Sequence, residues 1–153
     1  MNAPTQAIRF YRTTDDYGEF SNFARYSIFV DGKRWPTSEH YFQAMKFHDE
    51  ASRNEIRRAS TPAQAAEKGR DRKRKLRNDW ESVKDEVMRK ALIAKFTQHD
   101  ELRQLLLDTG DAWLIEHTAN DSYWGDGGDG SGKNKLGQLL MQVRDQIRKM
   151  PPK

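Results

Sequence analysis

The stretch SEHYFQAMKF, residues 38–47, is the segment around which the rest of the chain must fold. It predicts a helix, because Thr37 or Ser38 can cap the free amides of the first turn and Glu39 complements the positive end of the helix dipole. Its side chains are apolar in nearly every direction around the helix axis. A helix of that kind is buried rather than lying on a surface.

Three residues of this helix form a narrow polar stripe. At 100° per residue, Glu39, Gln43 and Lys46 lie at about 0°, 40° and −20° around the axis. Burying a carboxylate and an ammonium costs several kcal/mol unless they are paired. The pattern therefore fits either a structural Glu–Lys pair, partly exposed, or a catalytic stripe that faces a pocket.

Length and composition bound the fold. A chain of 153 residues predicts one domain over residues 1–153, with a core at about 8–149 and frayed ends at 1–6 and 151–153. The chain has no apolar run long enough for a signal peptide or for the ~20 residues that span a bilayer. We therefore expect a soluble, cytoplasmic protein with no membrane partner.

Composition also excludes several kinds of chemistry. The chain has no Cys, which excludes disulfides, a thiolate nucleophile and a Cys-based zinc site. Its four His residues lack the spacing of an HExxH motif. We expect no metal and no cofactor, and the net charge of +4 suits an anionic partner.

The remaining periodicity predicts a mainly α fold with a small N-terminal antiparallel β-sheet, an α+β class. Strands are expected at 7–11 and in a hairpin whose arms, 28–30 and 33–35, are joined by Asp31 and Gly32. Further helices are expected from Pro62 to Gly69, after Asp79, from Asp100 to before Gly110, and after Asn134. The expected inward faces of the last three are Trp80, Val83, Val87, Ala91 and Ala94; then Leu102, Leu105 and Leu106; then Leu136, Leu139, Leu140, Val143 and Ile147.

The stretch GGDGSGKN, residues 127–134, resembles a phosphate-binding P-loop only superficially. No buried strand precedes it, and Asn134 stands where Ser or Thr should hold magnesium. The nearby Asp residues lack EF-hand spacing, so calcium is not supported either. Two interpretations remain: backbone amides running into a helix capped by Asn134 that receive a phosphate, or a mobile surface loop before a capped helix.

A basic run occupies residues 70–77, with six cations: Arg70, Arg72, Lys73, Arg74, Lys75 and Arg77. Most such runs are solvated faces. The alternative is that some of these cations hold a sugar phosphate or pyrophosphate, or steer a polynucleotide.

The four tryptophans divide by context. Trp35 ends a hairpin strand and Trp113 lies in an apolar run, so we expect both in the core. Trp124 lies in an irregular segment, where its ring could stack on a base. Trp80, in the first turn of a helix, could serve either purpose.

Several separated motifs follow one another along nearly the whole chain. They are FSNF at 20–23, SEHYFQA at 38–44 with KF at 46–47, GR at 69–70, DW at 79–80, Met88, KF at 95–96, TG at 109–110, LIE at 114–116, Asp121, WG at 124–125, Gly132, NKLG at 134–137 and LM at 140–141. In order and spacing this series resembles the NADAR (NAD and ADP-ribose associated), or YbiA-like, family of N-glycosidases. The match covers roughly residues 8–145, although the segment between Gly125 and Gly132 is rich in Asp and Gly, where family members are expected to vary.

The resemblance implies cleavage of a bond between ribose C1 and an exocyclic amine. The family has two substrate classes, ADP-ribose on the amino group of guanine and the ribosylaminopyrimidine phosphates of riboflavin biosynthesis. ADP-ribosylated guanine, in DNA, RNA or a nucleotide, suits the dense cations of residues 70–77 better. A ribosylaminopyrimidine phosphate is the simplest substrate for a stand-alone chain, as the family's housekeeping members are. A non-catalytic binder of ADP-ribose or nucleic acid is a further alternative.

The resemblance also implies which residues form the site. Lys46 would be the amine that forms an imine with the sugar, Glu39 would shuttle protons, and Asp121 would orient the ribose hydroxyls or assist water. In the competing mechanism Glu39 or Asp121 activates water and Lys46 only neutralises charge. The expected substrate-binding residues are Ser21, Asn22, Phe23, Gln43, Gly69, Arg70, Trp80, Glu116, Trp124, Gly125 and Asn134.

Overall fold

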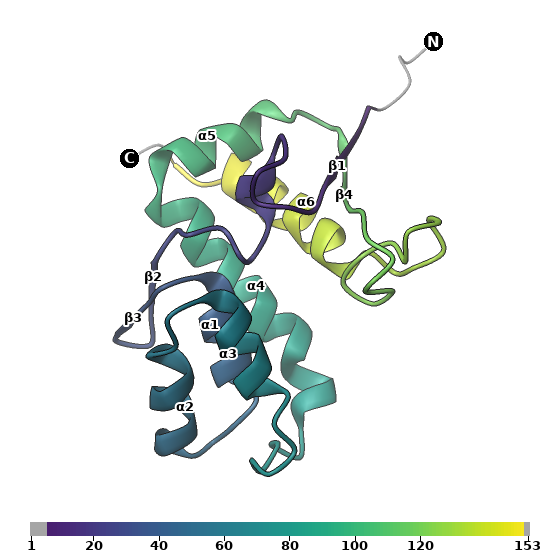
Figure 1. The fold of residues 1–153 in the computed structure, drawn as a ribbon. Helices are drawn as coiled ribbons and strands as arrows, with labels where there is room; N and C mark the ends of the chain where they lie inside the picture. Colours follow the sequence, from purple (N-terminus) through teal and green to yellow (C-terminus); the bar gives the residue numbers. More distant parts are fainter. Residues whose placement is uncertain (1–5, 152–153) are drawn as a thin grey trace. The chain divides into compact units, whose positions relative to one another are not determined.

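A computed structural model describes residues 6–151 of the chain, and these form two compact units (Figure 1). One unit is Asn22–Lys95; the other combines the chain up to Ser21 with the chain from Phe96. Each unit is considered by itself below. Apart from Gln6 and Pro151, the frayed ends predicted at 1–6 and 151–153 lie outside the described residues, and the prediction of one domain stays a prediction.

The unit formed by residues 22–95 is built around the predicted buried helix, α1. Its elements are β2 (Ile28–Val30), β3 (Lys33–Trp35), α1 (Ser38–Ala44), α2 (Glu50–Arg57), α3 (Pro62–Gly69) and most of α4 (Trp80–Gln98). Helix α1 contacts α2, α3 and β3, and all seven of its residues are buried. A helix enclosed in this way can carry polar side chains only if the surrounding elements provide for them.

The hairpin is confirmed at the residues predicted for it. Strands β2 and β3 pair antiparallel, with Ile28 opposite Trp35. Asp31 and Gly32 have φ angles of 55° and 78°, and Asp and Gly tolerate this left-handed conformation better than most residues. Trp35 is buried, as predicted.

The predicted helix caps are largely confirmed. The Thr37 side chain accepts a hydrogen bond from the backbone N–H of His40 and so caps α1. At the start of α3, Thr61 accepts the N–H of Gln64. The Gln64 side chain accepts the N–H of Ser60 rather than that of Thr61, which extends the capping motif by one residue.

Two helices differ from the sequence prediction. Helix α2 was not predicted, because its short sequence is mostly polar. In α4 the predicted inward face is only partly right: Trp80, Ala91 and Ala94 are buried, but Val83 and Val87 are half-buried. Met88 and Leu92, whose side chains are larger than valine, are buried instead.

The other unit contains the second β pair. Its elements are β1 (Ala7–Phe10), the 3₁₀ helix η1 (Gly18–Phe20), α5 (Asp100–Asp108), β4 (Trp113–Glu116) and α6 (Lys135–Arg148). The unpredicted strand β4 pairs in parallel with β1, with Ile8 opposite Leu114, and α6 packs against β4 and α5. Every residue predicted on the inward face of α6 is buried, and Leu102 and Leu106 of α5 are buried while Leu105 is half-buried.

The prediction that Trp113 belongs to the core is wrong, since 57% of the residue is exposed. Successive side chains of a strand point to opposite faces, and the fully buried Leu114 takes the inward position on β4.

The predicted fold class is confirmed: the described chain is mainly helical, with a small antiparallel β-sheet near its N-terminal end. Within residues 6–151, no helix is both long and apolar enough to cross a membrane.

Candidate active site

The start of α1 is fixed by Asn22. Its backbone carbonyl accepts the N–H of Glu39 at 3.3 Å, and its side-chain oxygen accepts the hydroxyl of Ser38 at 2.7 Å. Its amide nitrogen lies 3.4 Å from the sulfur of Met88 on α4. These contacts make Asn22, predicted as a substrate-binding residue, part of the frame that sets the direction of Glu39.

Glu39 and Gln43 form the buried polar pair that the helix pattern predicts. They are one turn apart and only 8% and 6% exposed, and the Gln43 amide donates a 2.6 Å hydrogen bond to the Glu39 carboxylate. The other side-chain atom of Gln43, Oε1, is buried without a hydrogen-bond partner among residues 6–151. A buried acceptor without a donor from the protein is costly to the folded state.

Gly69 of α3 makes room for this pair. A Cβ atom at Gly69 would lie 2.0 Å from Gln43 Oε1 and 2.8 Å from its Cδ. No larger residue fits there unless Gln43 moves. Gly69 therefore leaves room for the Gln43 side chain; its direct contact with substrate stays a prediction.

Lys46 lies beyond the end of α1, not within the helix as predicted. The helix ends at Ala44, after which the N–H groups of Lys46 and Phe47 bond to carbonyls only three residues back. Arg77 explains the early end: its backbone N–H binds the Lys46 carbonyl at 2.9 Å and its side chain binds the Met45 carbonyl at 3.3 Å. Arg53 binds the next carbonyl, that of Phe47, at 2.6 Å.

The surroundings of Lys46 favour its neutral amine. Burial is the largest influence and lowers the pKa of Lys46; the charge of Glu39 raises it and that of Arg70 lowers it, so that the pKa stays below its ordinary value. The ammonium nitrogen is 5.9 Å from the centre of the Phe42 ring, which in turn packs against Trp80 with ring centres 5.1 Å apart. Trp80 is itself buried, and the two rings together form an aromatic wall.

This arrangement can support covalent chemistry. A lysine whose pKa is lowered by burial has a larger fraction of neutral, nucleophilic amine near neutral pH. The charge of Glu39 acts on the pKa of the same lysine, and a carboxylate is a group that can transfer protons.

Six of the predicted site residues belong to the other unit: Ser21, Glu116, Asp121, Trp124, Gly125 and Asn134. There Asp121 organises a loop, because its Oδ1 accepts the N–H groups of Tyr123 and Trp124 at 2.9 and 2.8 Å. Gly125 is needed for packing, since a Cβ at that position would lie 2.8 Å from the Asp121 carbonyl. Trp124 is half-buried and meets the ring of Tyr123 edge-on.

The prediction that Asn134 caps the last helix is wrong. Asn134 has a φ of 52° and no capping hydrogen bond; its side chain instead binds the N–H of Glu116 and the carbonyl of Leu114, both at 2.9 Å. The first amides of α6, those of Lys135 and Leu136, bond to loop carbonyls. Two of the first amides of α6 are therefore already used and not available to a phosphate.

Three further predicted site residues are described by their exposure. Ser21 and Glu116 are half-buried, and Phe23, in the unit of Lys46, is 39% exposed. Two contributors were missed by the sequence analysis, Phe42 as the ring near the Lys46 amine and Arg77 as the residue that holds its backbone. The only sequence signal for Arg77 was its place at the end of the basic run, directly before the motif of Asp79 and Trp80.

The described residues contain no group of three or more His, Cys, Asp or Glu side chains that could hold a metal ion.

Comparison with known proteins shows which family the chain resembles. A family model described as the NADAR domain matches residues 9–148. The chain is 67% identical over 140 residues to N-glycosidase YbiA of Escherichia coli (strain K12), which covers 92% of this chain and 88% of that protein. An NMR structure of the E. coli protein YbiA matches with a TM-score of 0.88 and 64% identity, covering 96% of this chain and 88% of that one.

A second kind of relative is longer. A protein of Vibrio vulnificus (strain YJ016) named as a riboflavin biosynthesis protein is 43% identical over 151 residues, which cover 99% of this chain and 41% of that protein. The similarity therefore concerns less than half of that relative.

Proposed function

The chain belongs to the NADAR domain family and is a hydrolase acting on N-glycosyl compounds, and we propose that its substrate is guanine carrying ADP-ribose on its exocyclic amine. The observation that carries the proposal is the half-buried Lys46, with its lowered pKa, beside Glu39. An amine of this kind suits a sugar attached through nitrogen that keeps a hydrogen, because such a sugar can open to an imine.

In this reaction the exocyclic N–H loses its proton while the bond from C1 to the ring oxygen breaks and that oxygen takes up a proton. The neutral Lys46 amine adds to C1 of the resulting imine, and the guanine amine leaves with a proton. Water then adds to the Lys46 imine and releases the sugar and the free lysine. Glu39 accepts and returns the protons at each step.

The choice of ADP-ribose over a smaller sugar is supported by charge. The sequence pI is about 9.3, and five cations follow Arg70 within the next seven residues. A pyrophosphate, alone or attached to a polynucleotide, matches this density of positive charge better than a single phosphate does.

A second candidate is supported by the Vibrio vulnificus relative, whose name refers to riboflavin biosynthesis. In that case the substrate is a ribosylaminopyrimidine 5′-phosphate, and the same Lys46 and Glu39 perform the same steps. Side-by-side turnover of both compounds by the purified protein distinguishes the two candidates.

The role of Lys46 is tested by trapping. With substrate and borohydride, the wild-type protein should acquire a reduced sugar adduct on Lys46, identified by peptide mass analysis. Lys46→Arg keeps the charge but should form no adduct and turn over no substrate, whereas Lys84→Arg, a lysine on α4, should behave like wild type. Full turnover by Lys46→Arg would remove Lys46 from the mechanism.

Glu39→Gln separates an enzyme from a binder. We expect turnover to fall by about 10²–10⁴-fold, which is the range for loss of a general acid or base. A protein that only binds ADP-ribose would show no turnover in either form and unchanged affinity in the variant.

A further inference from the structure

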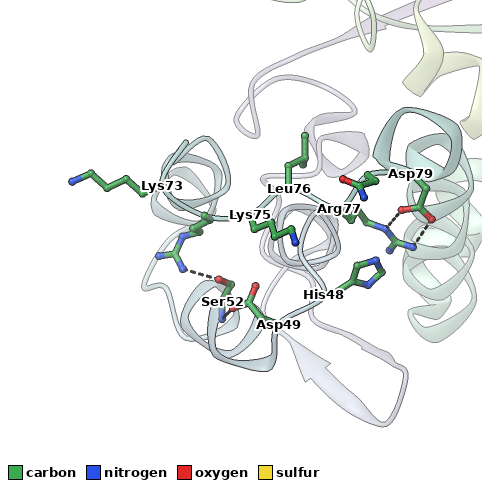
Figure 2. A pocket seen from close by; sticks show the side chains of 10 residues that line it. His48, Asp49, Ser52, Lys73, Lys75, Leu76, Arg77 and Asp79 are labelled. Carbon is green, nitrogen blue, oxygen red and sulfur yellow. Dashed lines mark hydrogen bonds and ion pairs between the residues drawn. The ribbon is translucent and has the colours of Figure 1, made fainter.

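A pocket of about 640 Å³ lies within the unit of residues 22–95, next to the segment that carries Lys46 (Figure 2). Its lining comes from two stretches of chain: His48, Asp49 and Ser52 on one side, and residues 73–79 on the other. The second stretch is the later part of the basic run, so the run does more than coat a convex surface.

Both carboxylates in this pocket already accept hydrogen bonds. The Asp49 carboxylate accepts the N–H of Ser52 at the start of α2, and Asp79 holds Arg77 through two hydrogen bonds of 2.6 and 3.0 Å. Hydrogen bonding from these partners lowers the pKa of both carboxyl groups, so they remain charged and engaged. Arg74 is engaged as well, with Glu55 at 2.8 Å.

Two cations are left without such partners. The ammonium groups of Lys73 and Lys75 make no ion pair or side-chain hydrogen bond with any residue in the described part of the chain, and both residues are exposed. Figure 2 shows Lys75 pointing between Asp49 and His48, while Lys73 extends away at the rim. The two lysines thus offer positive charge at two separate places, where a single small anion would use one.

The residues that line the pocket also include apolar surface. Leu76 is 49% exposed, although it lies in a run of cations, and His48, another lining residue, is exposed as well. An aliphatic side chain and an imidazole suit the face of a nucleobase, while lysines suit the phosphates on either side of it.

The pocket is joined directly to the reactive segment. Arg77, which lines it, binds the carbonyls of Met45 and Lys46. His48 follows Lys46 by two residues, a span of at most about 7 Å. The pocket therefore borders the backbone segment that carries Lys46.

We propose that this pocket, formed by Lys73, Lys75, Leu76 and His48, binds a nucleotide that flanks the modified guanine in single-stranded nucleic acid. The inference rests on the proposed function for the identity of the modified base. It adds that the modified base is presented within a polynucleotide, whose phosphates contact Lys73 and Lys75.

The test measures binding of an unmodified, fluorescein-labelled ten-nucleotide DNA by anisotropy over a series of salt concentrations. In the double variant Lys73→Gln/Lys75→Gln, the slope of log K against log salt should fall by about 1.4, since each phosphate contact to a single strand contributes about 0.7. The matched control Arg12→Gln/Lys149→Gln removes two exposed charges from the other unit and should keep the wild-type slope.

Two outcomes would overturn the proposal. An unchanged slope in the lysine variant, or an equal change in both double variants, would make the basic run a solvated face. The phosphate that Lys73 and Lys75 contact could also be the pyrophosphate of ADP-ribose, and calorimetry with ADP-ribose tests this. If the lysine variant loses affinity for ADP-ribose but not for DNA, the pocket binds the sugar nucleotide instead. Because the DNA carries no ADP-ribose, the slope remains informative even if turnover shows that the proposed reaction is wrong.

Discussion

At the scale of single residues, Lys46 is held between two opposite electrostatic influences. Glu39 raises its pKa and Arg70 lowers it, against the larger lowering that comes from burial. If the neutral amine is the nucleophile, kcat/KM rises with pH as Lys46 loses its proton, and the midpoint of this rise reports the pKa of Lys46 in the free enzyme.

Replacing Glu39 and replacing Arg70 should therefore shift the rising limb of the kcat/KM–pH profile in opposite directions. Glu39→Gln removes the charge that favours the ammonium, so the pKa of Lys46 falls and the limb moves to lower pH, even though the overall rate is reduced. Arg70→Gln removes a repelling cation, so the pKa of Lys46 rises and the limb moves to higher pH. The measurement is kcat/KM across pH for wild type and both variants.

Salt provides the control for this pair. Arg70 is exposed, so its influence should shrink at 1 M salt, where the screening length is about 3 Å. The more buried Glu39 should keep more of its effect. Limbs that move in the same direction in both variants would show that the rise does not belong to Lys46.

At the scale of elements, the contact between α1 and α3 sets the geometry of the polar stripe. Gly69 lacks the Cβ that would lie 2.0 Å from Gln43 Oε1, and Gln43 binds Glu39. Gly69→Ala should destabilise the protein by about 1–3 kcal/mol through overpacking, although in an open helix the change would be stabilising. Thermal unfolding measures the loss, and turnover should fall because Gln43 no longer holds Glu39.

A second substitution tests whether the clash is the cause. Gln43→Ala removes the side chain that Gly69→Ala would strike, so the double variant should recover stability relative to Gly69→Ala, with a coupling of about 0.5–3 kcal/mol. It should not recover turnover, because the Gln43 amide is gone. If Gly69→Ala is as stable and active as wild type, α1 and α3 do not meet as closely as described.

The elements of the other unit are joined through Asn134. Its side chain connects the first turn of α6 to the strand β4 through the backbone of Leu114 and Glu116. Gly137 allows this approach, because a Cβ there would lie 2.0 Å from the Leu114 carbonyl. Most backbone N–H groups of the glycine-rich loop before α6 also have hydrogen-bond partners. Its sequence resemblance to a phosphate-binding loop is therefore misleading.

At the scale of the whole molecule, the proposed reaction depends only on side chains of the chain. The sequence has no Cys, and the chemistry assigned to Lys46 and Glu39 needs no Lewis acid. We expect turnover to be unchanged after dialysis against EDTA, measured with the purified protein under otherwise identical conditions.

Adding magnesium or zinc back after EDTA treatment is the complementary measurement. Activity that is lost in EDTA and returns with magnesium or zinc would contradict the expectation and identify a metal site that neither the sequence nor residues 6–151 indicate. A known zinc-dependent hydrolase treated in parallel confirms that chelation was complete.

Features that depend on near neighbours could be predicted from the sequence. The hairpin follows from Asp31 and Gly32, whose left-handed conformations turn the chain within two residues. The inward face of α6 follows from leucines spaced at helical intervals, and the side-by-side placement of Glu39 and Gln43 follows from their separation of one turn. Each of these is fixed by backbone geometry within a few residues, which is why a local pattern can predict it.

Features that depend on distant partners could not be predicted from local patterns and follow from the folded chain. Arg77 and Arg53 take the carbonyls after Ala44 and so place Lys46 beyond the helix, a result that no pattern in residues 38–47 contains. The pairing of β4 with β1 left Trp113 outside the core and drew Asn134 away from its expected cap. A backbone group accepts whichever donor the fold brings to it, and that choice depends on contacts between residues far apart in the sequence.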